Sequence, residues 1–265
     1  MSMTAEHAVE EIRRFYRARA TDAPYATSPD WNLREVEIES IARHLTEDAR
    51  VLDVGCGNGY STLSFAARTR SDFHGIDFVP EMIEAAAQLR RRFELLGSAQ
   101  FHVGDVTHLP FAEGAFDVVI SQRCLLNLPS RREQRQAMAE IARVLKPDGV
   151  YLMLEGTLQG LGRLNRLRER FGLPAIPEAD PRTNWFSNKF DEDELPDMIR
   201  RHFRGITDVQ RFGMYYFLSR VLHPLLVMPE EPRFDAKLNA IARQICREIP
   251  DFEGLGHLAL WVIRK

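Results

Sequence analysis

Two different spacings of apolar residues alternate along the chain between residues 50 and 155. Short runs of β-branched and other apolar residues cover 51–54, 73–77, 100–103, 116–121 and 150–154. The stretches between them carry apolar residues at every third or fourth position. The first pattern is typical of buried strands and the second of amphipathic helices. Strands that alternate with helices predict right-handed crossovers, and therefore a parallel sheet with helices on both faces.

The helical spacing also appears before the first strand. Residues 4–19 carry apolar side chains at this spacing, which predicts a helix that covers the core. A loop follows, and Asn32 is the expected N-cap of a second helix leading to the first strand. Between the strands, helices are expected to begin near Tyr60 and at Pro80, and a third to end near Leu145.

The second half of the chain is less regular. Helices are expected over 158–171 and 191–203, and strands over 206–212 and 258–263. Roughly forty residues separate these two strands, which is longer than an ordinary connection. We interpret this stretch as a helical insertion, with one helix near 215–226 and another near 234–248.

Composition limits the classes of function. The chain has 265 residues, 45% of them hydrophobic, which is enough for a buried core. The formal charge of −3 offers no general attraction to nucleic acid or to an anionic membrane. The three cysteines lack metal-ligand spacing, so we expect a reduced, cytoplasmic protein without a metal. The charged N-terminus does not resemble a signal peptide, and the apolar stretch 215–228 is too short to span a bilayer.

A loop with glycine at alternate positions follows the first predicted strand. Gly55, Gly57 and Gly59 stand where a ligand can approach the backbone closely. A dinucleotide-binding loop would place its third glycine at the sixth position, where this chain has Tyr60. The spacing therefore argues against a pyrophosphate-bearing cofactor. Because ligands of parallel sheets bind beyond the carboxyl ends of the strands, polar residues at the other strand ends are candidate ligand contacts.

Four segments together resemble the class I S-adenosylmethionine-dependent methyltransferases. They are VLDVGCGNGYSTL from residue 51, GIDFVPEMIEAA from residue 75, GDVTHLPF from residue 104, and FDVVISQRCLLNL from residue 116 followed by ARVLKPDGVYLMLEG. The resemblance implies a Rossmann-like, doubly wound α/β fold with a mostly parallel seven-stranded sheet. Residues 1–265 would form one domain. Its parts are a helical cover (1–48), a cofactor-binding core (49–155) and two substrate-cap insertions (156–190 and 213–254), the second of them before the last strand.

The resemblance also implies roles for residues at the strand ends. An ionised carboxylate can accept hydrogen bonds from both ribose hydroxyls, which suits Asp77, and Asp105 with the Val106 backbone would read the adenine amino group. The alternative interpretations are a helix cap for Asp77 and a turn residue for Asp105. The expected cofactor-binding residues are Asp53, Gly55, Cys56, Gly57, Asn58, Gly59, Asp77, Phe78, Asp105, Val106, Ser121 and Arg123.

The implied reaction is in-line displacement of the methyl group of S-adenosyl-L-methionine by an acceptor, leaving S-adenosyl-L-homocysteine. Much of the catalysis would be proximity, because the positive sulfur already activates the methyl group. The expected partner is an apolar or aromatic small molecule, O-methylated rather than N- or C-methylated, and neither nucleic acid nor a membrane. The chain would be a monomer or a homodimer. The alternatives are a non-catalytic nucleotide-binding module and an RNA or protein methyltransferase.

Candidates for the acceptor side follow from their place near the strand ends and in the insertions. Glu155 and His223 are the candidate catalytic bases. Each has a simpler interpretation, because Glu155 can bind a backbone amide and His223 can end a helix before Pro224. The candidate substrate contacts are Tyr25, Asn127, Trp185, Phe186, Tyr215 and Tyr216. These aromatic residues can equally form the core of the insertions, and Asn127 can cap a loop.

Overall fold

The structure is a computed structural model, and it describes residues 5–21, 23–24, 26, 28–179, 187–227 and 237–265. Within these residues, the strands form one seven-stranded sheet in the order β3-β2-β1-β4-β5-β7-β6. The strands are β1(Arg50–Val54), β2(Asp72–Asp77), β3(Ser98–Val103), β4(Phe116–Gln122), β5(Leu145–Gly156), β6(Gly205–Arg211) and β7(Leu258–Arg264). The α-helices are α1(Ala5–Arg17), α2(Trp31–Ala42), α3(Tyr60–Ala66), α4(Pro80–Arg90), α5(Arg131–Val144), α6(Leu158–Arg170), α7(Leu195–Arg200), α8(Gly213–Tyr216), α9(His223–Val227) and α10(Lys237–Glu248).

The pairing of the strands confirms the mostly parallel sheet. β1 pairs in parallel with β2 and with β4. The pair of β2 and β3 and the pair of β4 and β5 are also parallel. β7 is antiparallel to both β5 and β6. The carboxyl ends of β1 to β5 therefore lie along one edge of the sheet, where the start of β7 joins them.

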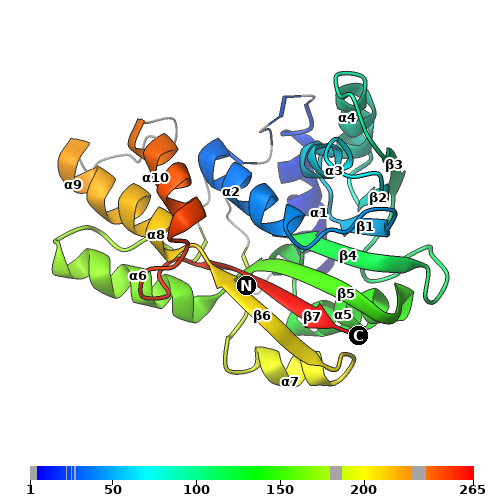
Figure 1. Ribbon diagram of the computed structural model, residues 1–265. Helices are drawn as coiled ribbons and strands as arrows, with labels where there is room; N and C mark the ends of the chain where they lie inside the picture. The colour runs from blue at the N-terminus through cyan, green and yellow to red at the C-terminus, as the bar shows by residue number, and fades with distance from the viewer. Residues whose placement is uncertain (1–4, 22, 25, 27, 180–186, 228–236) are drawn as a thin grey trace.

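Helices cover both faces of the central strands (Figure 1), and alternate residues of these strands belong to two separate core clusters. Val51 and Val118 pack with residues of α2, α3, α8 and α10 in one core cluster. Leu52 and Val119 pack with residues of α5 and α7 in a second cluster. This alternation follows from the period of two along a strand, and it confirms the prediction of helices on both faces.

The N-cap of α2 differs from the expected one. The cap is Asp30, whose side chain accepts a hydrogen bond of 3.1 Å from the Leu33 backbone N–H. Asn32 lies inside the first turn and is buried, so the prediction that it caps the helix was wrong. Both Asp and Asn are good caps, and only the path of the preceding loop decides between two neighbouring candidates.

The insertion before β7 is helical, as expected. α8 continues into a π-helical segment, η2(Phe217–Leu222), and then into α9, while α10 packs against α2 and α8. The helix expected over 191–203 is shorter than predicted, and in the structure it spans only α7(Leu195–Arg200). Among the described helices, none is long and apolar enough to cross a membrane.

Candidate functional site

A cavity of about 340 Å³ lies at the carboxyl ends of the parallel strands. Its floor contains residues that follow β1, β2, β3 and β4, and its far wall includes the residues at the start of β7. α1 and α2 supply Ile12, Phe15, Tyr16, Leu33 and Arg34 as a cover. The cavity is within the size range of small-molecule sites. It coincides with the edge of the sheet at which a ligand was expected.

The glycine loop lies against the floor of the cavity. Gly55, Gly57 and Gly59 all have positive φ angles, of 70°, 57° and 74°. A Cβ at Gly55 would lie 2.5 Å from the Cys124 Sγ, and a Cβ at Gly59 would lie 2.6 Å from the Phe101 ring. Glycine is therefore required here for the backbone angle and, at these two positions, for space. Gly55 and Gly57 line the cavity.

Asp77 connects the end of β2 to this loop. Its Oδ2 accepts a 2.9 Å hydrogen bond from the Gly57 N–H, and its Oδ1 accepts one of 2.9 Å from the Val79 N–H. Burial raises the pKa of Asp77 to about 6, against the opposing effect of these backbone donors. The N-cap of α4 is Val79 and no side chain caps this helix, so the interpretation of Asp77 as its cap was wrong. The bond from Val79 instead closes the turn before α4, and the Asp77 carboxylate lines the cavity.

Asp105 occupies the equivalent place after β3. Its Oδ1 accepts hydrogen bonds of 2.8 Å from both the backbone N–H and the hydroxyl of Thr107. Asp105 is thus the turn residue that the simpler interpretation described. Together with Phe78 and Val106 it also lines the cavity, in reach of the same ligand as Asp77.

A buried carboxylate at Glu37 holds several polar side chains of the cavity wall. Its Oε2 accepts a 2.6 Å hydrogen bond from the Gln122 Nε2 and lies 3.4 Å from the Arg123 Nε. The Arg34 Nη1 is 3.6 Å from the same oxygen. Burial, with the nearby charge of Arg123, lowers the pKa of Arg34 to about 10. The two arginines therefore reach the cavity already paired with a carboxylate.

Five expected cofactor residues do not belong to the lining of the cavity. Asp53 accepts a 2.6 Å hydrogen bond from the Thr62 hydroxyl, and burial raises the pKa of Asp53 to about 6. Asn58 donates to the carbonyl oxygens of Thr21 and Ala23, which ties the loop after α1 to the glycine loop. The residues outside the lining are Asp53, Cys56, Asn58, Gly59 and Ser121.

Ser121 and Cys56 are buried behind the cavity floor. The Ser121 hydroxyl is 2.8 Å from the Tyr151 hydroxyl. Burial raises the pKa of the Cys56 thiol, and likewise that of Cys124, well above the ordinary value. Both thiols therefore stay protonated at neutral pH, and Cys124 contributes to the lining of the cavity. No group of three or more His, Cys, Asp or Glu side chains in the described part of the chain is arranged to hold a metal ion.

Glu155 is fully buried and does not line the cavity. Its Oε1 accepts hydrogen bonds from the backbone N–H groups of Cys124 (3.1 Å) and Leu125 (2.9 Å), and its Oε2 accepts one from Leu126 (3.1 Å). Burial raises the pKa of Glu155 to about 7. This geometry matches the simpler interpretation, in which Glu155 binds backbone amides. His223 is also buried outside the lining.

The expected substrate contacts are distributed differently from the prediction. Asn127 lines the cavity and donates a 2.8 Å hydrogen bond to the Arg123 carbonyl. Tyr215 and Tyr216 are fully buried behind the lining, where Tyr215 donates to the Asp30 carboxylate at 2.6 Å. Tyr25, Trp185 and Phe186 lie outside the described residues.

Several lining residues were not identified from the sequence as site residues: Tyr16, Arg34, Lys189, Arg220 and His257. Tyr16 belongs to the helix predicted as a cover, and its aromatic pair with Phe15 on an amphipathic face was the available signal. Burial raises the pKa of the Tyr16 hydroxyl to about 12, so it stays protonated at neutral pH. The other four carry no local pattern that distinguishes them from surface residues.

Comparisons with known proteins agree with the geometry. Residues 51–149 match the model of a family described as a methyltransferase domain. The chain is 31% identical to a ubiquinone/menaquinone biosynthesis C-methyltransferase UbiE of Citrifermentans bemidjiense, covering 64% of this chain and 75% of that protein. It is 35% identical to a demethylmenaquinone methyltransferase of Lactiplantibacillus plantarum over 42% of this chain, and it spans only 47% of that relative.

The fold has the same kind of relatives. A solved structure of a S-adenosylmethionine-dependent methyltransferase from Methanosarcina mazei superimposes with a TM-score of 0.58 at 21% identity. The superposition covers 85% of this chain and 96% of that one. At this identity the likeness concerns the fold alone.

Proposed function

The chain belongs to the class I S-adenosylmethionine-dependent methyltransferases, and we propose that it transfers the methyl group of S-adenosylmethionine to a small organic acceptor. The observation that carries the proposal is the single cavity that brings together the glycine loop, Asp77 and Asp105 at the strand ends. When bound, S-adenosylmethionine supplies a methyl carbon that its positive sulfur has already activated.

The residues present fit this cofactor. Asp77 offers a carboxylate to the two hydroxyls of a ribose, and Asp105 offers one to an exocyclic amine. The backbone of Gly55 and Gly57 is open to the cavity and suits the polar end of a methionine group. Arg123 is the candidate partner for its carboxylate. Asp53, Cys56, Asn58, Gly59 and Ser121 would act by holding these residues in position.

A small acceptor is supported by the enclosing walls. Apolar residues of α1 and of the loop after β4 cover the cavity, and Asn127 and Tyr16 add polar groups. We assign 156–190 and 213–254 as the segments that cap the acceptor, with 1–48 as a cover over the core 49–155. Lys189 and Arg220 of the two caps line the cavity, which supports this assignment.

O-methylation is the first choice because of Lys189. Arg34, Arg123 and Arg220 are paired with Glu37 and Asp30, whereas the Lys189 ammonium donates to neutral oxygens in the described part of the chain. A cation of this kind favours an ionised oxygen acid over a protonated amine. C-methylation is the second candidate, because the relative from Citrifermentans bemidjiense is by name a C-methyltransferase. An acidic hydroxyl activates its neighbouring carbon as well as its oxygen, so the same walls serve both reactions.

The proposal can be tested with S-adenosylmethionine carrying a labelled methyl group. The protein is incubated with a panel of phenols, amines and carbon acids, and separately with bulk RNA and denatured protein. We expect label in one or more small acceptors, each with an equal amount of S-adenosylhomocysteine, and NMR then locates the methyl on oxygen or carbon. Label that enters only RNA or protein would contradict the proposal, and tight cofactor binding without any transfer would indicate a non-catalytic module.

A further inference from the structure

The backbone of the segment from Ser187 to Phe190 is hydrogen-bonded to the loop after β4 and to the end of β5. The Asn188 N–H donates to the Leu126 carbonyl at 2.7 Å, and the Phe190 N–H donates to the Gly156 carbonyl at 2.8 Å. The Lys189 carbonyl accepts a 2.7 Å hydrogen bond from Arg131. These bonds fix the backbone on both sides of Lys189 and place its side chain in the wall of the cavity.

Lys189 differs from the other cations of the cavity in its partners. Arg34 and Arg123 are paired with Glu37, and Arg220 is paired with Asp30. The Lys189 ammonium donates to two neutral oxygens, the Glu178 carbonyl and the Ser187 hydroxyl. Within the described residues, no carboxylate lies at ion-pair distance from it, and the Glu178 carboxylate acts only as a more distant charge.

Such an ammonium is unusual in a buried position. Lys189 is only 6% exposed, and burying a charge without a counter-ion costs free energy. Burial accordingly lowers the pKa of Lys189 to about 8, so the side chain is still mostly protonated at neutral pH. A negatively charged ligand in the cavity would remove this cost.

His257 lines the cavity with Lys189. Both residues pack around Gly156 at the end of β5. A Cβ built on Gly156 would lie 3.3 Å from the Lys189 Cγ, 3.4 Å from the Leu126 Cδ2 and 3.6 Å from the His257 backbone oxygen. Burial, with the charges of Lys189, Arg220 and Arg123, lowers the pKa of His257 to about 3, so the ring is neutral. A neutral imidazole offers one N–H donor and one nitrogen acceptor. The His257 Nε2 is 3.5 Å from the Tyr216 hydroxyl, while the Nδ1 has no partner among the described residues.

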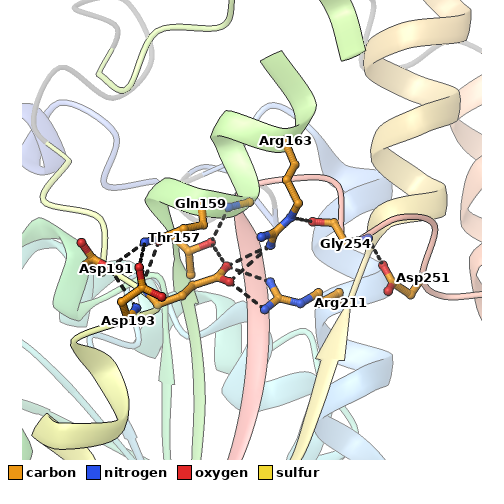
Figure 2. A network of polar contacts seen from close by, with 10 residues as sticks. Thr157, Gln159, Arg163, Asp191, Asp193, Arg211, Asp251 and Gly254 are labelled. Atoms are coloured by element: carbon orange, nitrogen blue, oxygen red, sulfur yellow. Dashed lines mark hydrogen bonds and ion pairs between the residues drawn. The ribbon is translucent and has the colours of Figure 1, made fainter. Parts of the chain in front are cut away.

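A polar network holds the segments that carry these two residues (Figure 2). Glu192 accepts hydrogen bonds from both terminal nitrogens of Arg211, at 2.9 Å each, and from the Thr157 hydroxyl at 2.7 Å. Arg163 bonds Glu192 and the Gly254 carbonyl, and the Thr157 N–H donates to the His257 carbonyl. The network thus joins the end of β5, α6, β6 and the loop before β7, next to the segments that carry Lys189 and His257.

We propose that Lys189, with His257 in the same cavity wall, forms an anion-binding subsite for the methyl acceptor, and that the acceptor is an organic acid bound through one negatively charged oxygen. The inference rests on the proposed function, because it concerns the acceptor side of the same cavity. The acid gives its proton to the buffer, and the anion replaces the missing counter-ion of Lys189.

The surroundings indicate a single charge on an apolar molecule. Only one cation of the cavity is without a carboxylate partner among the described residues, and Glu133 also lines the cavity, so a multiply charged phosphate is disfavoured. The remaining wall is apolar, with Phe15, Leu126 and Leu258. A phenolate, an enolate or a carboxylate on an aromatic or aliphatic body fits this combination.

The subsite is tested by binding, without an acceptor being known. The wild-type protein with saturating S-adenosylhomocysteine is titrated calorimetrically with 4-nitrophenolate, benzoate, benzyl alcohol and inorganic phosphate. We expect at least one organic anion to bind about tenfold or more tightly than benzyl alcohol, as a charge-assisted hydrogen bond should allow. Lys189→Gln should abolish that preference, and Lys189→Arg should keep it. The phenolate and benzoate arms distinguish the two kinds of acid.

The matched control is Lys146→Gln, which removes a lysine at the opposite end of β5, paired with Asp117. It should bind the anions as the wild type does, and all variants should keep wild-type affinity for S-adenosylhomocysteine, which also shows that they are folded. Equal anion binding by the wild type and Lys189→Gln, or preference for phosphate, would overturn the subsite. Failure of the wild type to bind S-adenosylhomocysteine would instead refute the proposed function.

Discussion

Replacing Asp77 by alanine is expected to weaken the binding of S-adenosylhomocysteine by about 100-fold or more. Two charge-assisted hydrogen bonds to the ribose hydroxyls would be lost, each worth roughly 1.5–3 kcal/mol. The Gly57 and Val79 N–H groups would also lose their acceptor, which loosens the glycine loop itself. Calorimetric titration measures the effect directly.

Asp72→Ala is the matched control for this variant. Asp72 lies at the other end of β2, its side chain is 44% exposed, and it does not line the cavity. Its replacement should leave the affinity for S-adenosylhomocysteine within about twofold of wild type, because exposed ion pairs contribute little. If Asp77→Ala folds and binds as tightly as Asp72→Ala, the assignment of Asp77 to the ribose is wrong.

The raised pKa of Asp77 gives this binding a pH dependence. Only the ionised carboxylate accepts two hydrogen bonds from a ribose, and the pKa of Asp77 is about 6 in the ligand-free protein. Affinity should therefore be full well above pH 6 and fall by up to about tenfold per pH unit below it. Asp53 titrates in the same range, so Asp77→Asn is the comparison that isolates Asp77. A variant that is weaker but equally pH-dependent would assign the effect to another group.

Replacing Glu155 by alanine is expected to lower the free energy of unfolding by about 3–5 kcal/mol. Three buried backbone N–H groups, those of Cys124, Leu125 and Leu126, would lose their acceptor, and each such loss costs roughly 1–3 kcal/mol. Denaturant unfolding followed by circular dichroism measures the loss. Glu155→Gln keeps one acceptor oxygen and should lose only about 1–2 kcal/mol.

Glu155 should also contribute to the pH dependence of stability. Burial raises the pKa of Glu155 from 4.5 to about 7, so the folded chain holds this proton more tightly than the unfolded chain. The resulting contribution to the free energy of unfolding is fully present below pH 4.5 and is lost as the pH rises through 7. The stability difference between wild type and Glu155→Gln should shrink accordingly over that range. If Glu155→Ala keeps full stability and loses only the rate of methyl transfer, Glu155 is catalytic after all.

The fold of residues 50–155 could be predicted because local pattern and global topology agree there. Each buried strand has its own apolar run, and β-branched residues such as Val118 and Val119 suit both faces of a covered sheet. The cap of α2 was missed by two residues, because Asp30 and Asn32 are equally good caps in sequence. The length of α7 was overestimated from the sequence, because its buried residues extend over less than two turns.

The site could be predicted only where a strand end defines it. Asp77 is the last residue of β2 and Asp105 lies two residues after β3, so the topology placed them at the cavity. Glu155 also lies at a strand end, but its side chain points to the backbone of residues 124–126. The direction of one side chain at a strand end depends on the neighbouring loop, which periodicity does not describe.

No local sequence pattern indicated that Lys189 and His257 belong to the wall of the cavity. Lys189 and His257 are almost 70 residues apart and meet only because the segments that carry them both bond to the end of β5. That meeting depends on long-range contacts such as those of Glu192 with Arg163 and Arg211. From the sequence alone, a lysine between Asn188 and Phe190 is expected on the surface, because these backbone contacts of the segment cannot be predicted from local pattern.

The central claim is that the cavity holds an adenosyl group that ends in a methionine, and one titration tests it most directly. The wild-type protein is titrated by calorimetry with S-adenosylhomocysteine, S-adenosylmethionine and NAD under the same conditions. We expect one adenosyl ligand per chain to bind with a Kd of about 1–100 μM or tighter, corresponding to roughly 5–8 kcal/mol or more, and NAD to give no measurable heat. Tighter binding of NAD, or no binding of either adenosyl ligand, would contradict the account.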